Sequence, residues 1–220
     1  MDLGLKNKVA LITGASSGLG LAIANELSQE GASVVMVARR KDELDKHAAA
    51  IGGRTYGKLL TIAADVGDAE AASRIVAEVE EKLGPIDILV ANAGGPPSTL
   101  FDSTTDAQYQ AAINLNLLGS IRLAHAVVPG MRARKWGRVL FLTSMAAKMP
   151  IQGLILSNTA RAGLLGFAKT LANEVAKDGV LVNTVMPGHF DTARAIELAQ
   201  MRATREQRPL EEVLAARQGG

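Results

Sequence analysis

A glycine-rich turn near the N-terminus constrains the fold of this chain more than any other feature. The turn, Thr13–Gly20 (TGASSGLG), follows an apolar, β-branched run and precedes an amphipathic segment. A strand that leads through such a turn into a helix directs backbone N–H groups and the positive helix end at one spot, where an anion binds. Gly14 permits the tight turn, and Gly18 allows a pyrophosphate to approach the backbone closely. Gly20 allows the helix to pack closely on the strand. We therefore predict a dinucleotide-binding unit here.

Short β-branched runs alternate with longer amphipathic stretches along the chain. The runs are apolar throughout, as in a parallel sheet whose two faces are both covered. This rhythm predicts an α/β fold: a doubly wound, Rossmann-type, mostly parallel sheet with helices on both faces and ligands at the carboxyl ends of its strands. The predicted strands are Val9–Thr13, Ser33–Ala38, Leu59–Ala64, Ile86–Asn92, Arg138–Ser144 and Val180–Val185. The predicted helices are 19–30, 41–52, 69–83, 106–134 and 152–177.

After the last predicted strand the rhythm stops, and residues 193–206 and 209–218 have the pattern of two charged amphipathic helices. We predict one Rossmann-type domain over residues 1–220, which is long enough to bury a large core. Residues 193–220 are predicted to form a helical segment of that domain. A lid over the ligand site and a surface helical pair are two equal interpretations of this segment.

Composition narrows the function classes. The chain has no cysteine, which excludes disulfides and thiolate metal sites and fits a reducing compartment. Its net charge of +2 implies no acidic partner, and the cluster Arg132, Arg134, Lys135 and Arg138 around Trp136 is interpreted as a solvated helix end rather than a nucleic-acid surface. The N-terminus lacks the layout of a signal peptide, and no stretch is judged long enough to span a bilayer. We expect a soluble, cytoplasmic protein without metal, nucleic-acid or membrane partners.

The end of the second predicted strand sets the expected choice of cofactor. An acidic side chain there accepts hydrogen bonds from the ribose hydroxyls of NAD and repels a 2'-phosphate. This chain instead has Ala38 followed by Arg39 and Arg40, and a guanidinium pairs well with phosphate. We therefore expect NADP(H) to be favoured over NAD(H), with Arg39 contacting the 2'-phosphate. The alternative is that both arginines are solvated residues at a helix start.

With these residues placed, the chain resembles the short-chain dehydrogenase/reductase superfamily, and within it the 3-oxoacyl-carrier-protein reductases, over residues 7–192. The Thr13–Gly20 turn fits the family's TGxxxGxG loop, and residues 92–94 (NAG) fit the motif that stabilises the sheet beside the cofactor. Together with the loop and Arg39, the resemblance gives a set of expected cofactor-binding residues. These are Gly14, Ser16, Ser17, Gly18, Leu19, Gly20, Arg39, Asp65, Val66, Asn92, Ala93, Gly94, Arg161, Pro187, Gly188 and Thr192.

The expected catalytic site departs from this family. Where the family has a tyrosine and a lysine four residues apart, this chain has Ser157 and Arg161. In the family, the tyrosine protonates the carbonyl oxygen while NADPH delivers hydride, and the lysine binds the nicotinamide ribose and lowers the pKa of the phenol. Ser144 fits the serine that holds the substrate carbonyl, and Asn116, in preference to Asn114, fits the helix asparagine that orders a proton-relay water. The expected catalytic residues are Ser144, Ser157, Arg161 and Asn116.

The substituted pair keeps the spacing of one helical turn, so Ser157 and Arg161 face the same way. We expect Arg161 to hold the ribose hydroxyls and to place positive charge near a developing alkoxide. Ser157 is expected to position a water in the space that the phenol occupies in the family. Ser144 is expected to act as an oxyanion donor. Lys148 and His189 are alternative acids, because each lies shortly after a predicted strand.

Three functions fit these residues. The first is an NADP(H)-dependent oxidoreductase that interconverts a carbonyl and an alcohol, with a 3-oxoacyl thioester as the substrate the resemblance suggests. The second is an NADP-binding protein with little or no turnover, a sensor or scaffold. The third is a lyase or isomerase in which Arg161 binds an anionic substrate. Family members run further and add a seventh strand, which helps to form their tetramer. We expect this chain to lack that strand. We also expect it to form a homodimer or homotetramer.

Overall fold

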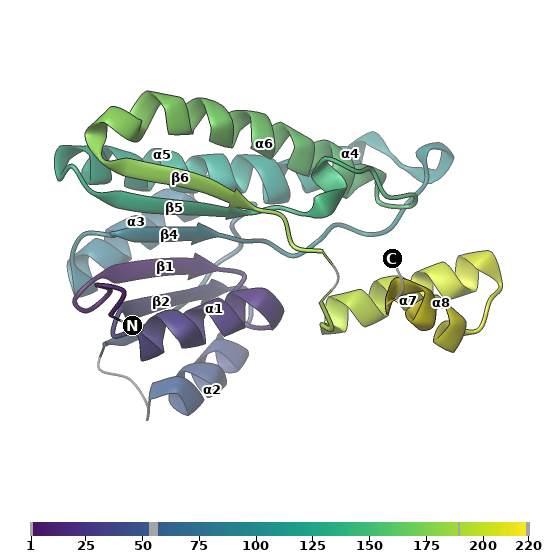
Figure 1. Ribbon diagram of the computed structural model, residues 1–220, viewed down its shortest axis with the longest axis horizontal. Coiled ribbons are helices and arrows are strands. Elements are labelled where there is room, and N and C mark those ends of the chain that lie inside the picture. The colour runs from purple at the N-terminus through teal and green to yellow at the C-terminus, as the bar shows by residue number, and fades with distance from the viewer. Residues whose placement is uncertain (1, 53–56, 189, 219–220) are drawn as a thin grey trace.

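The computed structural model describes residues 2–52, 57–188 and 190–218. Its strands are β1 Val9–Thr13, β2 Ser33–Ala38, β3 Leu59–Ala63, β4 Ile88–Ala91, β5 Gly137–Leu142 and β6 Val180–Val185. They form one six-stranded sheet in the order β3-β2-β1-β4-β5-β6, and every neighbouring pair is parallel (Figure 1). The strand order reverses between β1 and β4, which places a crevice at their carboxyl ends. The predicted doubly wound, Rossmann-type α/β fold is confirmed.

Helices cover both faces of the sheet (Figure 1). On one face, α1 (Gly18–Gln29) and α2 (Lys41–Gly52) pack over the first strands. On the other face lie α3 (Ala71–Leu83), α5 (Gly119–Ala133) and α6 (Ile155–Val175). The remaining elements of this part are α4 (Asp106–Ile113), a π-helical turn Asn114–Leu118 that joins α4 to α5, and the 3-10 segments Phe101–Ser103, Met145–Ala147 and Ala176–Asp178.

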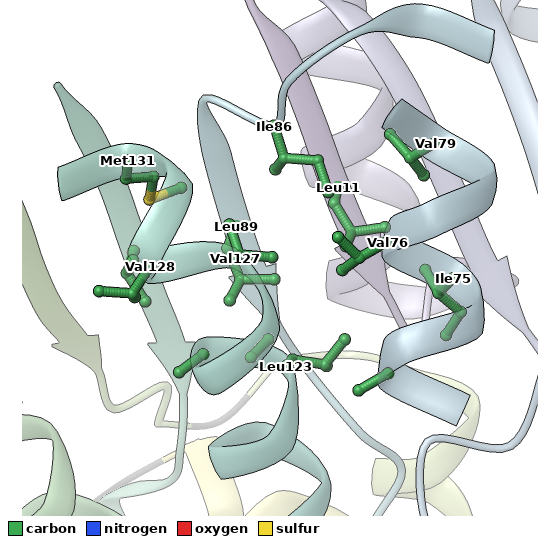
Figure 2. Close-up of a cluster of buried hydrophobic side chains, with 14 of the residues drawn as sticks. Leu11, Ile75, Val76, Val79, Ile86, Leu89, Leu123, Val127, Val128 and Met131 are labelled. Atoms are coloured by element: carbon green, nitrogen blue, oxygen red, sulfur yellow. The ribbon is translucent and has the colours of Figure 1, made fainter. Parts of the chain in front are cut away.

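The larger core lies between the sheet and the layer of α3, α5 and α6. Figure 2 shows how α3 and α5 direct apolar side chains at the strands. On α5, Leu123, Val127 and Met131 recur every four residues, so they share one face, and all three are buried against Leu89 of β4 and its neighbours. Each such side chain stabilises the fold by about 1.5–3 kcal/mol on burial. This packing fixes the strand ends that carry the candidate site.

The helical stretch Asp106–Ala133 corrects one sequence expectation. It is 28 residues long, and the mean hydropathy of its most apolar window is 1.3, so by length and composition alone it is able to cross a membrane. This differs from the expectation that no stretch of the chain is long enough to span a bilayer. In the fold, α5 packs against α3 and α6, and 44% of that window is buried inside the protein. Core packing therefore accounts for much of its apolar character.

The last elements, α7 (Ala193–Glu206) and α8 (Leu210–Gln218), lie beyond the carboxyl ends of the strands and apart from both helix layers (Figure 1). They pack on each other around Ala199, Ala203 and Val213. Strand β6 forms one edge of the sheet, and alternate residues of it are exposed, among them Leu181 and Val185. Within residues 2–52, 57–188 and 190–218, no further strand pairs with β6.

Candidate cofactor and catalytic site

A cavity of about 830 Å³ opens at the carboxyl ends of the strands. The size is that of a site for a small molecule or cofactor. Its wall includes nine of the residues expected from the sequence, namely Gly14, Ser16, Ser17, Arg39, Asp65, Val66, Asn92, Ala93 and Gly94. Arg40, which the sequence placed beside Arg39, lines the cavity as well. Sequence reasoning missed a second group of lining residues, namely Gly95, Pro96, Pro97, Gln108, Ala111, Ala112 and Leu115. The α4 members of that group carry no motif, so only the tertiary fold reveals them.

The glycine-rich turn forms one end of this cavity and leaves a helix N-terminus open. Ser17 is the N-cap of α1, yet its side chain makes no capping hydrogen bond. The first N–H groups of α1 are therefore free to bind an anion. Gly14 and Gly18 have φ angles of +60° and +55°, and a Cβ at Gly20 would overlap the carbonyl oxygen of Gly14. These backbone demands explain the glycines, while Leu19 lies in the first turn of α1.

Asn92 ties the ends of β1 and β4 together. The Thr13 hydroxyl donates to the Asn92 carbonyl at 2.7 Å, and the Asn92 amide N–H donates to the same hydroxyl at 2.9 Å. The Asn92 side chain also donates to the Gly14 carbonyl at 3.4 Å. Asn92 therefore holds the glycine-rich turn against the central strands. This matches the sheet-stabilising place that the family's NAG motif implied for it.

Arg39 and Arg40 give the β2 end of the cavity a positive charge. Both side chains are exposed, and in the described part of the chain neither forms an ion pair. On the neighbouring strand, the Asp65 carboxylate accepts the N–H of Gly67 at 2.9 Å, which shapes the turn after β3. A Cβ at Gly119 would overlap the Val66 carbonyl oxygen at 2.5 Å, so α5 also packs closely on this turn. An anionic ligand group would be favoured at the two arginines.

Ser157 and Arg161 lie on α6, and both are 8% exposed. The Arg161 Nε donates to Ser157 Oγ at 3.2 Å. One terminal nitrogen donates to the carbonyls of Leu142 and Thr143, both at 3.0 Å, and the other donates to the Ala93 carbonyl at 3.3 Å. These four bonds use all but one of the N–H groups that a guanidinium carries. Arg161 thus binds the backbone where β4 and β5 end, which the sequence analysis did not foresee.

Arg161 is a buried cation without a carboxylate partner among the described residues. Burial lowers the pKa of its guanidinium to about 10, and the positive charge of Arg194 contributes in the same direction. At neutral pH the group is still charged. Arg161 therefore places a buried positive charge at the ends of β4 and β5. The structure engages most of its donors with protein carbonyls, so the ribose contact expected from the sequence stays a prediction.

Ser144 and Asn116 each keep free hydrogen-bonding capacity. Ser144 caps the segment Met145–Ala147, and its Oγ accepts the N–H of Ala146 at 3.1 Å, which leaves the hydroxyl proton to donate. Asn116 is 2% exposed, and its side-chain nitrogen donates to the Gly94 carbonyl at 2.8 Å. Its Oδ1 is buried and has no partner in the described part of the chain. A buried acceptor of this kind is commonly satisfied by a water.

The segment after β6 crosses in front of the glycine-rich turn. The Pro187 carbonyl accepts the N–H of Met145 at 3.2 Å, and Gly188 follows it. Thr192 is the N-cap of α7 and accepts the N–H of Ala195 at 3.3 Å. Its methyl group would lie 3.5 Å from a Cβ placed on Gly18, so this segment lies close to the turn.

The two alternative acids have different outcomes. His189 lies outside the described residues, so its role stays a prediction. Lys148 follows the segment Met145–Ala147, and its side chain is exposed. This exposure favours a solvent-facing side chain over a catalytic acid for Lys148.

Arg194 is a candidate site residue that sequence reasoning missed. It lies in the first turn of α7, and its guanidinium donates to the Pro96 carbonyl on the cavity wall and to the Glu197 carboxylate, the latter at 2.8 Å. Its Nε would lie 3.2 Å from a Cβ on Gly95. Arg194 thus links α7 to the loop that follows β4. The one available sequence signal was a basic residue at a helix start, where the helix dipole disfavours positive charge.

Comparison with known proteins places these features in a family. A family model described as short chain dehydrogenase matches residues 8–203. An acetoacetyl-CoA reductase from Shinella zoogloeoides is 38% identical over 186 residues, which cover 84% of this chain and 75% of the relative. A 3-oxoacyl-[acyl-carrier-protein] reductase from Vibrio harveyi is 36% identical over 190 residues, which cover 86% of this chain and 76% of the relative.

A solved structure shows the same relationship. L-sorbose reductase from Gluconobacter frateurii, complexed with NADPH and L-sorbose, is 38% identical and superposes with a TM-score of 0.88. The match covers 93% of this chain and 78% of that one. The resemblance inferred from the motifs is confirmed. This chain belongs to the short-chain dehydrogenase family and is an oxidoreductase of the carbonyl/alcohol type, related to 3-oxoacyl-carrier-protein reductases.

Proposed function

We propose that this protein binds NADP(H) in preference to NAD(H) and reduces a carbonyl group with two serine hydroxyls and a water in place of a phenol. The observation that carries the proposal is the cavity that joins an uncapped helix N-terminus to Arg39 and Arg40, which form no ion pair with any described residue. The first feature suits a pyrophosphate and the second a 2'-phosphate. The L-sorbose reductase structure, which contains NADPH, supports the same choice.

The residues of the cavity fit such a cofactor. A Cβ at Gly14 would lie 2.7 Å from the Asn92 side chain and one at Gly20 would overlap the backbone, so the turn keeps its phosphate-binding shape only with glycine at these positions. In the proposal, Ser16, Ser17 and the first turn of α1 hold the pyrophosphate, and Arg39 holds the 2'-phosphate. When bound, NADPH supplies the hydride. The remaining chemistry belongs to residues on β5 and α6.

In this proposal, the hydroxyls of Ser144 and Ser157 donate to the substrate oxygen. The Ala146 N–H occupies a lone pair of the Ser144 oxygen, and the Arg161 guanidinium occupies one of the Ser157 oxygen. Each hydroxyl proton is therefore left to point elsewhere. A hydrogen bond from a charged donor polarises the Ser157 hydroxyl and makes it a better donor itself. Two such donors stabilise the negative charge that develops on the oxygen as the carbonyl is reduced.

Proton supply falls to water in this proposal. The buried Asn116 Oδ1 has an unused acceptor site, and the backbone around it belongs to the π-helical turn between α4 and α5. Such turns are common at functional sites. A water on Asn116 Oδ1 can pass a proton towards the serines. Loss of a phenolic general acid costs about 10²–10⁴-fold in rate, so we expect slow turnover.

A second candidate function is NADP binding with little or no turnover, in a sensor or scaffold. It is favoured by the three backbone carbonyls that Arg161 binds, because a residue committed to the ends of β4 and β5 serves the fold whether or not chemistry occurs. Both candidates bind NADP(H), but only the reductase oxidises NADPH. The same purified protein therefore decides between them.

The deciding experiment follows NADPH absorbance with ketones, aldehydes and 3-oxoacyl thioesters, the last chosen because of the names of two relatives. A fluorescence titration measures binding in parallel. Oxidation that is lost in both Ser144→Ala and Ser157→Ala, but kept in the control Thr159→Ala on the exposed side of α6, supports the reductase. Tight binding without oxidation supports the second candidate. Absence of NADPH binding overturns both.

The proposal retains two expectations about the state of the protein. We propose a soluble, cytoplasmic enzyme that acts as a homodimer or homotetramer on a small carbonyl or alcohol. Sedimentation of the purified protein tests the assembly, since a monomer at micromolar concentration would contradict it.

A further inference from the structure

A second guanidinium lies close to the buried cation on α6. Arg194 is half-buried and reaches from α7 to the Pro96 carbonyl, while Arg161 binds the Ala93 carbonyl in the same loop. The two charges are near enough that Arg194 contributes to the lowered pKa of Arg161. Like charges repel most strongly where water is partly excluded. Two cations placed together in this way call for a negative group.

The protein supplies little negative charge there. In the described part of the chain the one carboxylate that pairs with Arg194 is Glu197, three residues along the same helix, and no carboxylate pairs with Arg161. The Glu197 side chain is 56% exposed. Exposed pairs of this kind are weak, so a ligand anion can replace Glu197. The Pro96 carbonyl is a neutral partner that an anion also outcompetes.

The position of Arg194 within α7 strengthens the argument. It lies in the first turn, where the helix dipole adds further positive potential, and no acidic residue occupies that turn. A basic residue there lowers helix stability slightly. The cost is explained if Arg194 faces a ligand. Gly95 also leaves space for its guanidinium, since a Cβ there would lie within 3.2–3.6 Å of it.

We propose that Arg194, with the field of Arg161 behind it, binds an anionic oxygen group beside Gly95 and Pro96 at the wall of the cofactor cavity. The inference rests on the proposed function, which places a dinucleotide in this cavity. The anion is either a carboxylate on the substrate or the phosphate on the nicotinamide half of the cofactor. Both present oxygen atoms that a planar guanidinium binds in a fork. Arg194 is thus a binding and specificity residue.

The test compares wild-type protein with Arg194→Gln by calorimetric titration. Acetoacetate and levulinate, added to protein saturated with NADP+, probe a carboxylate, and their ethyl esters are the matched neutral ligands. Reduced nicotinamide mononucleotide probes the nicotinamide-side phosphate, and 2',5'-ADP probes the adenine half. We expect Arg194→Gln to weaken binding of the oxo acids, or of the mononucleotide, by about tenfold or more. Binding of the esters and of 2',5'-ADP should change by less than about twofold.

Two further variants sharpen the test. Arg202→Gln removes an exposed arginine two turns along α7, where its partner is Glu206, and should leave every affinity unchanged. Glu197→Gln removes the competing carboxylate. It should therefore increase the affinity for the probe whose binding Arg194→Gln weakens. If Arg194→Gln loses affinity only for the oxo acids, the anion is a substrate carboxylate. If it loses affinity only for the mononucleotide, the anion is the cofactor phosphate.

The inference is overturned if Arg194→Gln leaves both probes unaltered, or if the wild-type protein binds neither of them. Those outcomes can be told apart from a failure of the proposed function. NADPH oxidation with neutral ketones can persist while the anion subsite fails. Conversely, the oxo acids or the mononucleotide can bind through Arg194 in a protein that never oxidises NADPH.

Discussion

Arg161 donates through Nε to Ser157, one turn before it on α6, at 3.2 Å. The same guanidinium reaches the carbonyls of Ala93, Leu142 and Thr143, so it joins α6 to the ends of β4 and β5. A lysine ammonium is a single point of donation, whereas a guanidinium is a planar fork. The small Ser157 side chain leaves room for that fork. The two substitutions therefore form one structural unit rather than two independent losses.

Arg161→Met should destabilise the fold. The variant keeps an unbranched side chain but leaves three backbone carbonyls and the Ser157 hydroxyl without their donor. We expect a loss of about 2–4 kcal/mol in the free energy of unfolding, because each buried acceptor left unsatisfied costs about 1–3 kcal/mol and the losses overlap. Urea unfolding followed by circular dichroism measures it. Thr159→Ala on the same helix is the control, and an equal loss there would contradict the role of Arg161.

The loss in the free energy of unfolding that Arg161→Met causes should not depend on pH near neutrality. The pKa of Arg161 is lowered to about 10 in the folded protein, so the folded state releases this proton before the unfolded state does. Burial of the charge therefore reduces stability below about pH 10, and this reduction is relieved only as the pH rises above about 10. Between about pH 6 and about pH 9 the difference between wild type and variant should be constant. Urea titrations at both pH values check this, and a change above about 1 kcal/mol would refute it.

The strands and helices were predictable because local pattern determines them. Strands Val9–Thr13, Ser33–Ala38 and Val180–Val185 match the sequence prediction residue for residue. The predictions for β4 and β5 ran on to Asn92 and Ser144, whereas the structure ends these strands at Ala91 and Leu142. Asn92 and Ser144 are polar and lie beyond the ends of these strands, and Asn92 lines the cavity. An apolar pattern cannot show where a strand leaves its neighbours.

The site was predictable only where one short motif builds it. The turn after β1 places its own glycines, and Arg39 follows from a strand end. The partners of Arg161 come from three separate segments, and Arg194 meets Pro96 across 98 positions of sequence. Such contacts depend on helix packing. The sequence contains the donors but does not indicate which carbonyls they meet.

Arg39→Asp should shift the preference towards NADH. The change removes a cation from the cavity wall at the end of β2 and places a carboxylate where it would repel a 2'-phosphate and accept ribose hydroxyls. We expect the ratio of NADPH to NADH affinity to fall by about tenfold or more, since a charge-assisted bond contributes about 1.5–3 kcal/mol. Fluorescence titrations with both cofactors measure it. Unchanged relative affinities would remove Arg39 from this role, and Arg40→Asp would then be the next variant.

Gly20→Ala and Gly166→Ala form a matched pair within helices. A Cβ at Gly20 would overlap the Gly14 carbonyl, whereas one at Gly166 on α6 would have nothing within 4 Å. We expect Gly20→Ala to distort the turn and weaken NADPH binding by about tenfold or more. Gly166→Ala should instead raise the free energy of unfolding by about 0.5–1 kcal/mol, because alanine favours helix. NADPH titration and urea unfolding of both variants measure these two effects. Full NADPH affinity in Gly20→Ala would contradict the role of Gly20.

Restoring the family's pair should separate a slow reductase from a cofactor-binding protein. In Ser157→Tyr with Arg161→Lys, a phenol is restored on α6 and the shorter ammonium frees space that the guanidinium fills. If Ser144, Asn116 and the cofactor cavity are already in register, the phenol should raise kcat by about 10²–10⁴-fold while NADPH affinity changes little. Ser157→Tyr alone should gain less, because Arg161 stays bound to its carbonyls. A folded double variant that binds NADPH but gains no turnover would mean that the rest of the site no longer aligns a carbonyl, and would favour the sensor or scaffold.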